Sequence, residues 1–201
     1  YDLEAELLKV KDTEQKKKKK KKKNDDKPEP EPKTKITHKH VPMSFSVYDN
    51  IPGYSQEYFY DNEDPINLVE TLFSHLDKLC EEASKLMQEK MQPLIEAIEG
   101  YYHEKRRKKY LRDVRDYCKS VPIVGFNSGF YDTGIMLNYH FMREILKRDQ
   151  KPAVAKAGNK YKFIKAGKFL FLDQSQYLAA GTSLAKFMTA FEGGENKGFF
   201  P

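Results

Sequence analysis

The chain has no tryptophan, only two cysteines, and no run of 18 or more apolar residues among its 201 positions. Cys80 and Cys118 are not in a C-x-x-C spacing, which excludes a disulfide framework and a cysteine-based zinc site. An intracellular, reducing compartment is therefore the default expectation. Without a long apolar run or a secretory leader, we expect no membrane partner. Because the chain opens at Tyr1 rather than Met and closes on an apolar end at Pro201, we expect a fragment of a longer protein.

Hydrophobic residues make up 39% of the chain and aromatic residues 13%, which is too much for a chain that is disordered throughout. The length predicts one domain with a real core. The net charge of +6 is concentrated between Lys11 and Lys39, where 13 lysines face six acids. The rest of the chain is close to neutral, with 23 basic and 24 acidic residues. Bulk charge alone therefore does not predict a nucleic-acid partner.

A low-complexity segment occupies residues 11–39. Eight consecutive lysines, Lys16–Lys23, precede a Pro-Glu repeat, and such a segment cannot bury apolar surface. We predict a disordered Lys/Pro/Glu-rich insertion over 11–39. Two interpretations stay open, a phosphate-binding or nuclear-localisation tract and a tolerated surface loop without a packed role.

Strand patterns recur along the chain. In residues 1–9 apolar side chains alternate with acids, which predicts a strand, although a short amphipathic helix fits almost as well. Val41–Tyr48 places every second apolar residue on one face and predicts a half-buried strand. Further strands are expected at 121–126, 153–156, 161–164 and 169–173, the last three separated by turn residues.

Helical patterns lie between these strands. Asp64-Pro65 supplies an N-cap and a first-turn proline for a long helix, and we expect a helical region over 64–118 that Pro93 and Gly100 break or kink. A second amphipathic helix is expected to begin close to Asp132 and run to about 146, and a last one follows Thr182. The mixture predicts an α/β fold with antiparallel hairpins.

Three acids are the candidate catalytic and metal-ligating residues. Residues two apart in a strand face the same way, so Asp2 and Glu4 would present a pair of carboxylates. Asp132 follows a buried strand and begins a helix, at the sheet end where α/β proteins build sites. Mg²⁺ takes oxygen ligands, and two such ions support phosphodiester cleavage. The alternative is that Asp2 and Glu4 are surface acids on a terminal strand.

The segment Asn127–Asp132 is the more specific motif. A strand that leads through Asn127 and Tyr131 into Asp132 combines an amide that can contact a base, an aromatic platform and a metal ligand. The alternative interpretation is an Asn-Ser-Gly turn followed by a helix cap.

Together, Asp2-Leu3-Glu4 and Asn127-Ser128-Gly129-Phe130-Tyr131-Asp132 resemble the first and second exonuclease motifs of family B DNA polymerases, D-x-E and N-x₂₋₃-(F/Y)-D. The chain from His40 onward is most similar to the organellar, viral and mobile-element branch, which uses protein-primed synthesis. The stretches that carry this similarity are 39–47, 121–128, 168–173 and 197–201.

The resemblance implies a ribonuclease-H-like exonuclease fold with a mixed sheet and a long helical insertion, with 1–201 as a partial exonuclease domain. The full protein would be a DNA-directed DNA polymerase with 3′→5′ proofreading. Asp2, Glu4 and Asp132 would bind Mg²⁺ or Mn²⁺. The implied partners are DNA, as a single-stranded 3′ end and as primer-template, and a terminal protein.

The resemblance also implies that Asn127 and Tyr131 hold the last nucleotides of a frayed primer. Family members carry an (S/T)-L-x₂-h element that touches single-stranded DNA. Ser183–Phe187 matches its letters, but by position the counterpart is Ser175. The third motif, Y-x₃-D, has no convincing counterpart before the chain stops, so we expect the fragment alone to be a poor nuclease or none.

Rival interpretations remain open. The chain can be a non-catalytic, single-stranded-DNA-binding remnant of such a polymerase, or a helical interaction protein built on 64–118. The basic run Lys105–Lys109 has two interpretations: it contacts the phosphates of a DNA backbone, or it is a solvated helix face. His38 and His40 form no zinc-site spacing and are expected to have solvent or packing roles.

Overall fold

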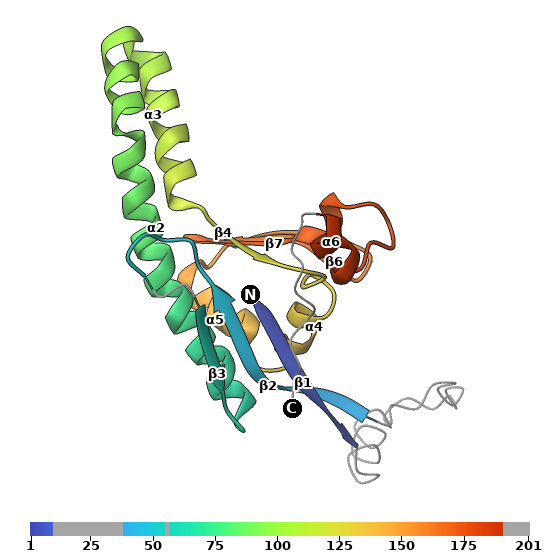
Figure 1. Ribbon diagram of the computed structural model, residues 1–201. Helices are drawn as coiled ribbons and strands as arrows, with labels where there is room; N and C mark the ends of the chain where they lie inside the picture. Colours follow the sequence, from blue (N-terminus) through green and yellow to red (C-terminus); the bar gives the residue numbers. More distant parts are fainter. Residues whose placement is uncertain (10–37, 55–56, 191–201) are drawn as a thin grey trace, which may run out of the picture.

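The structure is a computed structural model that describes residues 1–9, 38–54 and 57–190. Two β-sheets pack against the helix α2, and the far end of α2 projects with α3 as an arm (Figure 1). The elements are β1 (Asp2–Lys9), β2 (His38–Tyr48), β3 (Glu57–Asp61), α2 (Pro65–Tyr101), α3 (Glu104–Lys119), β4 (Val121–Gly125), α4 (Asp132–Met136), α5 (Phe141–Arg148), β5 (Ala153–Ala157), β6 (Lys160–Ala166), β7 (Phe169–Asp173), the 3₁₀ turn η1 (Gln174–Tyr177) and α6 (Leu184–Ala190). The prediction of a mixed α/β fold is confirmed.

The first sheet is antiparallel, in the order β1-β2-β3. Its register places Leu3 opposite Phe45, and both side chains are buried. Residues 1–9 therefore form the predicted strand, and the helical alternative for them is wrong. The sequence patterns did not predict β3, because its five residues, Glu-Tyr-Phe-Tyr-Asp, do not alternate between polar and apolar, although their burial does.

The second sheet has the order β4-β7-β6-β5, with β4 parallel to β7 and the other pairs antiparallel. The predicted strands at 121–126, 153–156, 161–164 and 169–173 are confirmed within a few residues. This sheet is mixed, as expected, and the strands of the chain are divided between it and the antiparallel first sheet. The two sheets meet at β1, where the backbone nitrogen of Tyr1 donates to the carbonyl oxygen of Val124 at 2.8 Å.

The predicted helical region is present as α2 and α3. A carboxylate oxygen of Asp64 accepts from the backbone N–H groups of Ile66 and Asn67, so the expected N-cap is confirmed. Pro93 does not end the helix, because α2 continues to Tyr101, directly after Gly100. Of the break or kink expected at Pro93 and Gly100, the break next to Gly100 is confirmed, and a break at Pro93 is contradicted. Pro93 is exposed, so water can reach the carbonyl that loses its intrahelical hydrogen bond.

The second predicted helix is two helices. α4 ends at Met136, and α5 begins at Phe141 after His140, whose φ of 67° lies in the left-handed region. A residue in that region cannot continue a right-handed helix. The insertion predicted over 11–39 falls outside the described residues except for its last two, His38 and Lys39, which belong to β2. The final predicted helix is confirmed as α6.

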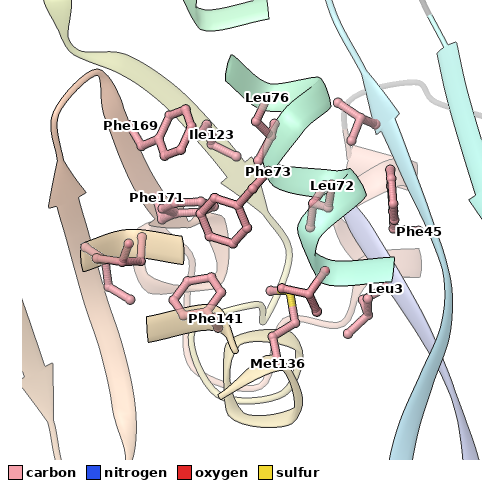
Figure 2. Packing of buried hydrophobic residues seen from close by; sticks show 14 of the residues in the cluster. Leu3, Phe45, Leu72, Phe73, Leu76, Ile123, Met136, Phe141, Phe169 and Phe171 are labelled. Atoms are coloured by element: carbon pink, nitrogen blue, oxygen red, sulfur yellow. The ribbon is translucent and has the colours of Figure 1, made fainter. Parts of the chain in front are cut away.

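One apolar core joins both sheets to α2 and α5. Phe73 of α2 lies among Phe141, Phe169 and Phe171, with ring centroids 5.3 to 5.9 Å apart. Leu3 and Phe45 approach from the first sheet on the other side of α2, and Met136 fills the space below (Figure 2). Burial of these side chains fixes the position of α2 between the sheets and thereby the orientation of β1 toward β4.

Candidate functional site

The acids of β1 lie on one face of that strand, as alternation requires. Leu3 is buried between them, while Asp2 is exposed and Glu4 is partly exposed. Asp2 pairs with Ser46 and Glu4 with Ser44 of β2. The two carboxylates therefore project from the same side of the first sheet.

Asp132 begins α4 and is buried, with 3% of its surface exposed. Its Oδ2 atom has no hydrogen-bond partner among the residues that the structure describes. Burial first, and then the negative charges of Asp2, Asp173 and Glu4, raise the pKa of Asp132 to about 7, against the opposing charge of the amino group of Tyr1. An acid on the first strand and an acid more than a hundred residues later thus share one electrostatic environment.

The turn before Asp132 is built on Asn127. Asn127 has a φ of 57°, a left-handed conformation that asparagine tolerates better than most residues. Its carbonyl oxygen accepts from the backbone N–H groups of Phe130 and Tyr131, at 3.3 and 3.2 Å. The alternative interpretation of this segment as a turn is therefore correct for its backbone, and that turn carries the side chains of Asn127, Tyr131 and Asp132.

Tyr131 is exposed and contacts β2. Its hydroxyl lies 3.1 Å from Nδ1 of His40, and the two rings meet edge to face with centroids 5.4 Å apart. Tyr139 adds a hydrogen bond of 3.4 Å to the carbonyl oxygen of His40. His40, for which the sequence predicted a solvent or packing role, therefore positions the aromatic ring of the second motif.

Ser175 lies beside a different carboxylate, Asp173 at the end of β7. Asp173 is 1% exposed, and its Oδ1 atom accepts from the backbone N–H and the hydroxyl of Ser175, at 2.9 and 2.7 Å. Its Oδ2 atom accepts from the backbone N–H of Gly129, at 3.2 Å. Ser175 thus supports a buried acid that in turn holds the Asn127–Asp132 segment.

Asp173 is the residue that the sequence reasoning missed as part of this site. The available signal was its place at the carboxyl end of a buried strand, Phe-Leu-Phe-Leu-Asp, next to a second buried strand. Because β4 and β7 are parallel and pair Gly125 with Asp173, both strands end at the same edge.

The segment 183–187, which matches the (S/T)-L-x₂-h pattern, lies near the edge at which β4 and β7 end. The hydroxyl oxygen of Ser183 accepts from the backbone N–H of Lys186 at 3.2 Å and so begins α6. The ring of Phe187 lies 6.1 Å from that of Phe126, the residue before Asn127. Both segments considered for this element therefore lie close to the second motif.

The residues that the structure describes contain no group of three histidine, cysteine, aspartate or glutamate side chains placed to hold a metal ion. The charges of Asp2 and Glu4 raise the pKa of Asp132, but the three carboxylates do not form a closed ligand set among the described residues. Hard-cation chemistry still fits the donor set, since all three are carboxylates and one has a buried oxygen without a partner.

No protein-family model, curated protein or solved structure matches the chain. Among the helices of the described residues, none is both long enough and apolar enough to cross a membrane.

Proposed function

We propose that the chain carries the 3′→5′ exonuclease region of a family B, protein-primed DNA polymerase on a ribonuclease-H-like fold. One observation carries the proposal: Asp132 of the second motif is buried with an unpartnered oxygen and lies in the electrostatic field of Asp2 and Glu4 from the first motif. A buried carboxylate in the field of other carboxylates is costly unless it serves a function or a cation neutralises it. The full protein would extend and proofread DNA on a primer-template, with a terminal protein as a possible partner.

The topology supports the same proposal. An exonuclease of this class needs its D-x-E strand and its second motif at one edge, and the Tyr1 to Val124 hydrogen bond brings the start of β1 to β4. β4 and β7 run parallel and end beside the Asn127–Asp132 turn. Two segments with the expected motifs therefore meet at a place where α/β proteins commonly bind ligands.

Asp2, Glu4 and Asp132 would hold Mg²⁺ or Mn²⁺. When bound, the ion supplies charge neutralisation and a water of lowered pKa for phosphodiester cleavage. The protein's own contribution is to hold Asp132 in place: β4 leads into the turn, and Asp173 anchors Gly129. A cation would also lower the pKa of Asp132 from about 7 and keep it ionised.

Tyr131 and Asn127 would contact the 3′-terminal nucleotides. Tyr131 is 38% exposed and its hydroxyl is held by His40, so a ring of fixed orientation faces solvent beside the acids. Bases stack on such rings without regard to sequence, which suits a site that must accept any terminal nucleotide. Ser175 would act on DNA indirectly, through Asp173, or directly by reorientation of its hydroxyl.

The test is release of nucleotides from the 3′ end of a labelled single-stranded oligonucleotide in Mg²⁺, by the protein extended beyond Pro201 so that a third motif is included. Asp132→Asn should lower the rate by at least about 100-fold, because a metal ligand is lost while the side-chain volume is kept. Asp116→Asn, at an exposed position of α3, is the matched control and should leave the rate unchanged. An extended protein without nuclease activity, or one that Asp132→Asn leaves active, would rule the proposal out.

The second candidate is a non-catalytic remnant that binds single-stranded DNA. It is favoured by the lack of a closed set of three metal-binding side chains among the described residues. It predicts oligonucleotide binding that Asp132→Asn leaves intact, with no cleavage by the parent protein. Nuclease activity in the extended protein would exclude it.

A further inference from the structure

A groove of about 550 Å³ runs along one side of the helical arm. The arm consists of the far half of α2 and of α3, and it extends away from both sheets (Figure 1). Six residues line most of the groove: Met91, Leu94 and Ile98 from α2, and Tyr110, Val114 and Tyr117 from α3. The groove is remote from Asp132 along the fold and does not belong to the candidate exonuclease site.

Exposed tyrosines mark the groove. Tyr117 is 61% exposed at the end nearer the sheets, and Tyr110 is 37% exposed nearer the tip of the arm. The ring of Tyr110 lies 4.8 Å from that of Tyr102. Because these tyrosine rings are exposed to solvent, their flat faces are available for stacking. Rings packed in a core would not be accessible in this way.

Two cations of α3, Arg106 and Lys109, lie on or beside the groove face. α3 holds eight lysines and arginines against three acids, and within the described residues Lys105, Arg106, Lys109 and Arg115 make no ion pair. Steps of three and four residues place Arg106 on the same helix face as Tyr110 and Tyr117, and Lys109 lies next to that face.

The acids of the arm are divided between two sides. On α2, the same geometry turns Glu89 and Glu96 away from Met91 and the groove, whereas Asp113 of α3 lines the groove. The groove side therefore combines exposed aromatic rings with the cations Arg106 and Lys109 and with one acid.

We infer that this groove binds single-stranded nucleic acid, with bases stacked on Tyr110 and Tyr117 and phosphates contacted by Arg106 and Lys109. The inference goes beyond the proposed exonuclease and requires neither Asp132 nor a metal ion. Counterion release supplies the attraction to phosphates, and stacking distinguishes single strands from a duplex whose bases are already stacked.

An acidic helix from a partner protein is the competing occupant of an apolar groove. The exposed rings of Tyr110 and Tyr117 separate the two cases, because they offer stacking surfaces to bases, which a helix does not carry. Asp113, which also lines the groove, can accept hydrogen bonds from the exocyclic amino groups of bases. The stacking surfaces therefore favour a nucleic acid.

The first measurement is fluorescence anisotropy of a labelled 20-nucleotide single strand of mixed sequence, with the full chain in EDTA. The lysines at 16–23 give every variant the same electrostatic background, so binding is compared at about 0.3 M salt, where that background is weak. Arg106→Glu/Lys109→Glu should weaken binding by about tenfold or more. It should also reduce the slope of log K against log salt concentration by about 1.4, because each of the two lost phosphate contacts contributes about 0.7. Lys151→Glu/Lys160→Glu, on exposed positions of the second sheet region, makes the same change in charge and should have a much smaller effect.

Tyr117→Leu tests stacking separately. It keeps apolar cover in the groove, and the fold should tolerate it because Tyr117 is largely exposed. We expect single-strand binding to fall by about tenfold while duplex binding stays the same. Irradiation of a bound strand that contains 5-iodouracil should cross-link it to Tyr110 or Tyr117, as mapped by mass spectrometry.

Three results would overturn the inference. The first is equal loss of binding in the arm and control charge reversals, which would mean diffuse attraction. The second is cross-linking only outside residues 101–117. The third is unchanged single-strand affinity in both Tyr117→Leu and Arg106→Glu/Lys109→Glu. That result would mean that the groove does not bind nucleic acid and would favour a protein partner as its occupant. None of these results bears on the exonuclease proposal, and loss of nuclease activity in Asp132→Asn does not bear on the arm.

Discussion

The backbone N–H of Gly129 donates a hydrogen bond of 3.2 Å to Oδ2 of Asp173, a residue 44 positions later in the chain. This bond ties the turn after β4 to the end of β7, and the same carboxylate accepts two hydrogen bonds from Ser175. Asp132 follows the turn directly, so its position depends on a buried acid that belongs to another strand. The candidate site therefore rests on contacts between segments far apart in sequence.

Gly129→Ala should destabilise the protein. A Cβ atom at this position would lie 2.2 Å from the carbonyl oxygen of Tyr161 and 3.1 Å from Oδ2 of Asp173, so the backbone would have to move. We expect a loss of about 2 kcal/mol or more in the free energy of unfolding, measured by urea denaturation. The matched control is Gly134→Ala, where a Cβ atom meets nothing within 4 Å and a helix position should be unharmed. Equal effects at both positions would contradict the close packing of Gly129.

Ser175→Ala should also destabilise the protein, because it removes the hydroxyl that donates to a buried carboxylate at 2.7 Å. A hydrogen bond to a charged acceptor contributes roughly 1.5 to 3 kcal/mol, so we expect a loss of about 2 kcal/mol. Denaturation and single-strand binding should be measured on the same sample. Weaker DNA binding with unchanged stability would instead indicate that Ser175 contacts DNA directly, as the polymerase resemblance implies.

Asp132→Asn should stabilise the metal-free protein at pH 8. The pKa of Asp132 rises from its ordinary 3.8 to about 7 in the folded state, so between these values the folded state binds more protons than the unfolded state. Stability therefore falls as pH rises from about 4 to 7 and then levels off. Asparagine removes this penalty, and we expect a gain on the order of 2 kcal/mol at pH 8 that disappears near pH 4.

Urea denaturation in EDTA at pH 4, 6 and 8 checks this pH dependence. Asp116→Asn is the control, since that side chain is exposed on α3 and its removal should matter little at any of the three pH values. A loss of stability at pH 8 in Asp132→Asn would show that other groups of the protein stabilise the ionised carboxylate of Asp132. In that case its burial would be a structural feature and would no longer favour a cation.

Arg148→Met should be the most destabilising of these changes. The guanidinium bonds Asp77 of α2, donates to the buried Glu144 at 2.9 Å, and lies 4.8 Å from the ring centroid of Phe73. Burial alone would raise the pKa of Glu144, but hydrogen bonds from Lys147 and Arg148 lower it, so the charge is kept inside by its partners. Methionine leaves that charge with one partner fewer, at a cost of about 3 kcal/mol.

Arg112→Met provides the contrast for Arg148→Met. Arg112 pairs with Asp113 at 3.7 Å, and both side chains are more than half exposed, so its loss should cost less than about 0.5 kcal/mol. The two variants are compared by their denaturation midpoints. Similar midpoints would mean that the Arg148 cluster does not join α2 to α5 as the geometry indicates.

Features encoded within a few residues of the chain were predictable. Alternation in residues 1–9 and 41–48 identified β1 and most of β2, and Asp64-Pro65 identified the start of α2, because pleating and capping act over one turn or one pair of residues. The apolar runs before Asn127 and Asp173 identified β4 and β7. The sequence also determined that Asp2 and Glu4 share a face, since that follows from strand geometry alone.

Tertiary structure decided the rest. Whether Asp2 and Asp132 meet depends on how β1 is oriented toward β4, and burial of Leu3 and Phe73 on opposite sides of α2 sets that orientation. The helix expected after Asp132 divides at His140, whose backbone is left-handed, and α2 continues through Pro93, whose exposed position lets water reach the carbonyl freed by the proline. The roles of Asp173 and His40 also depend on partners far away in the chain. Local patterns specify secondary-structure elements over a few residues. The contacts that place a carboxylate in a site need the conformational order that burial of a core, formed by residues from the whole chain, stabilises.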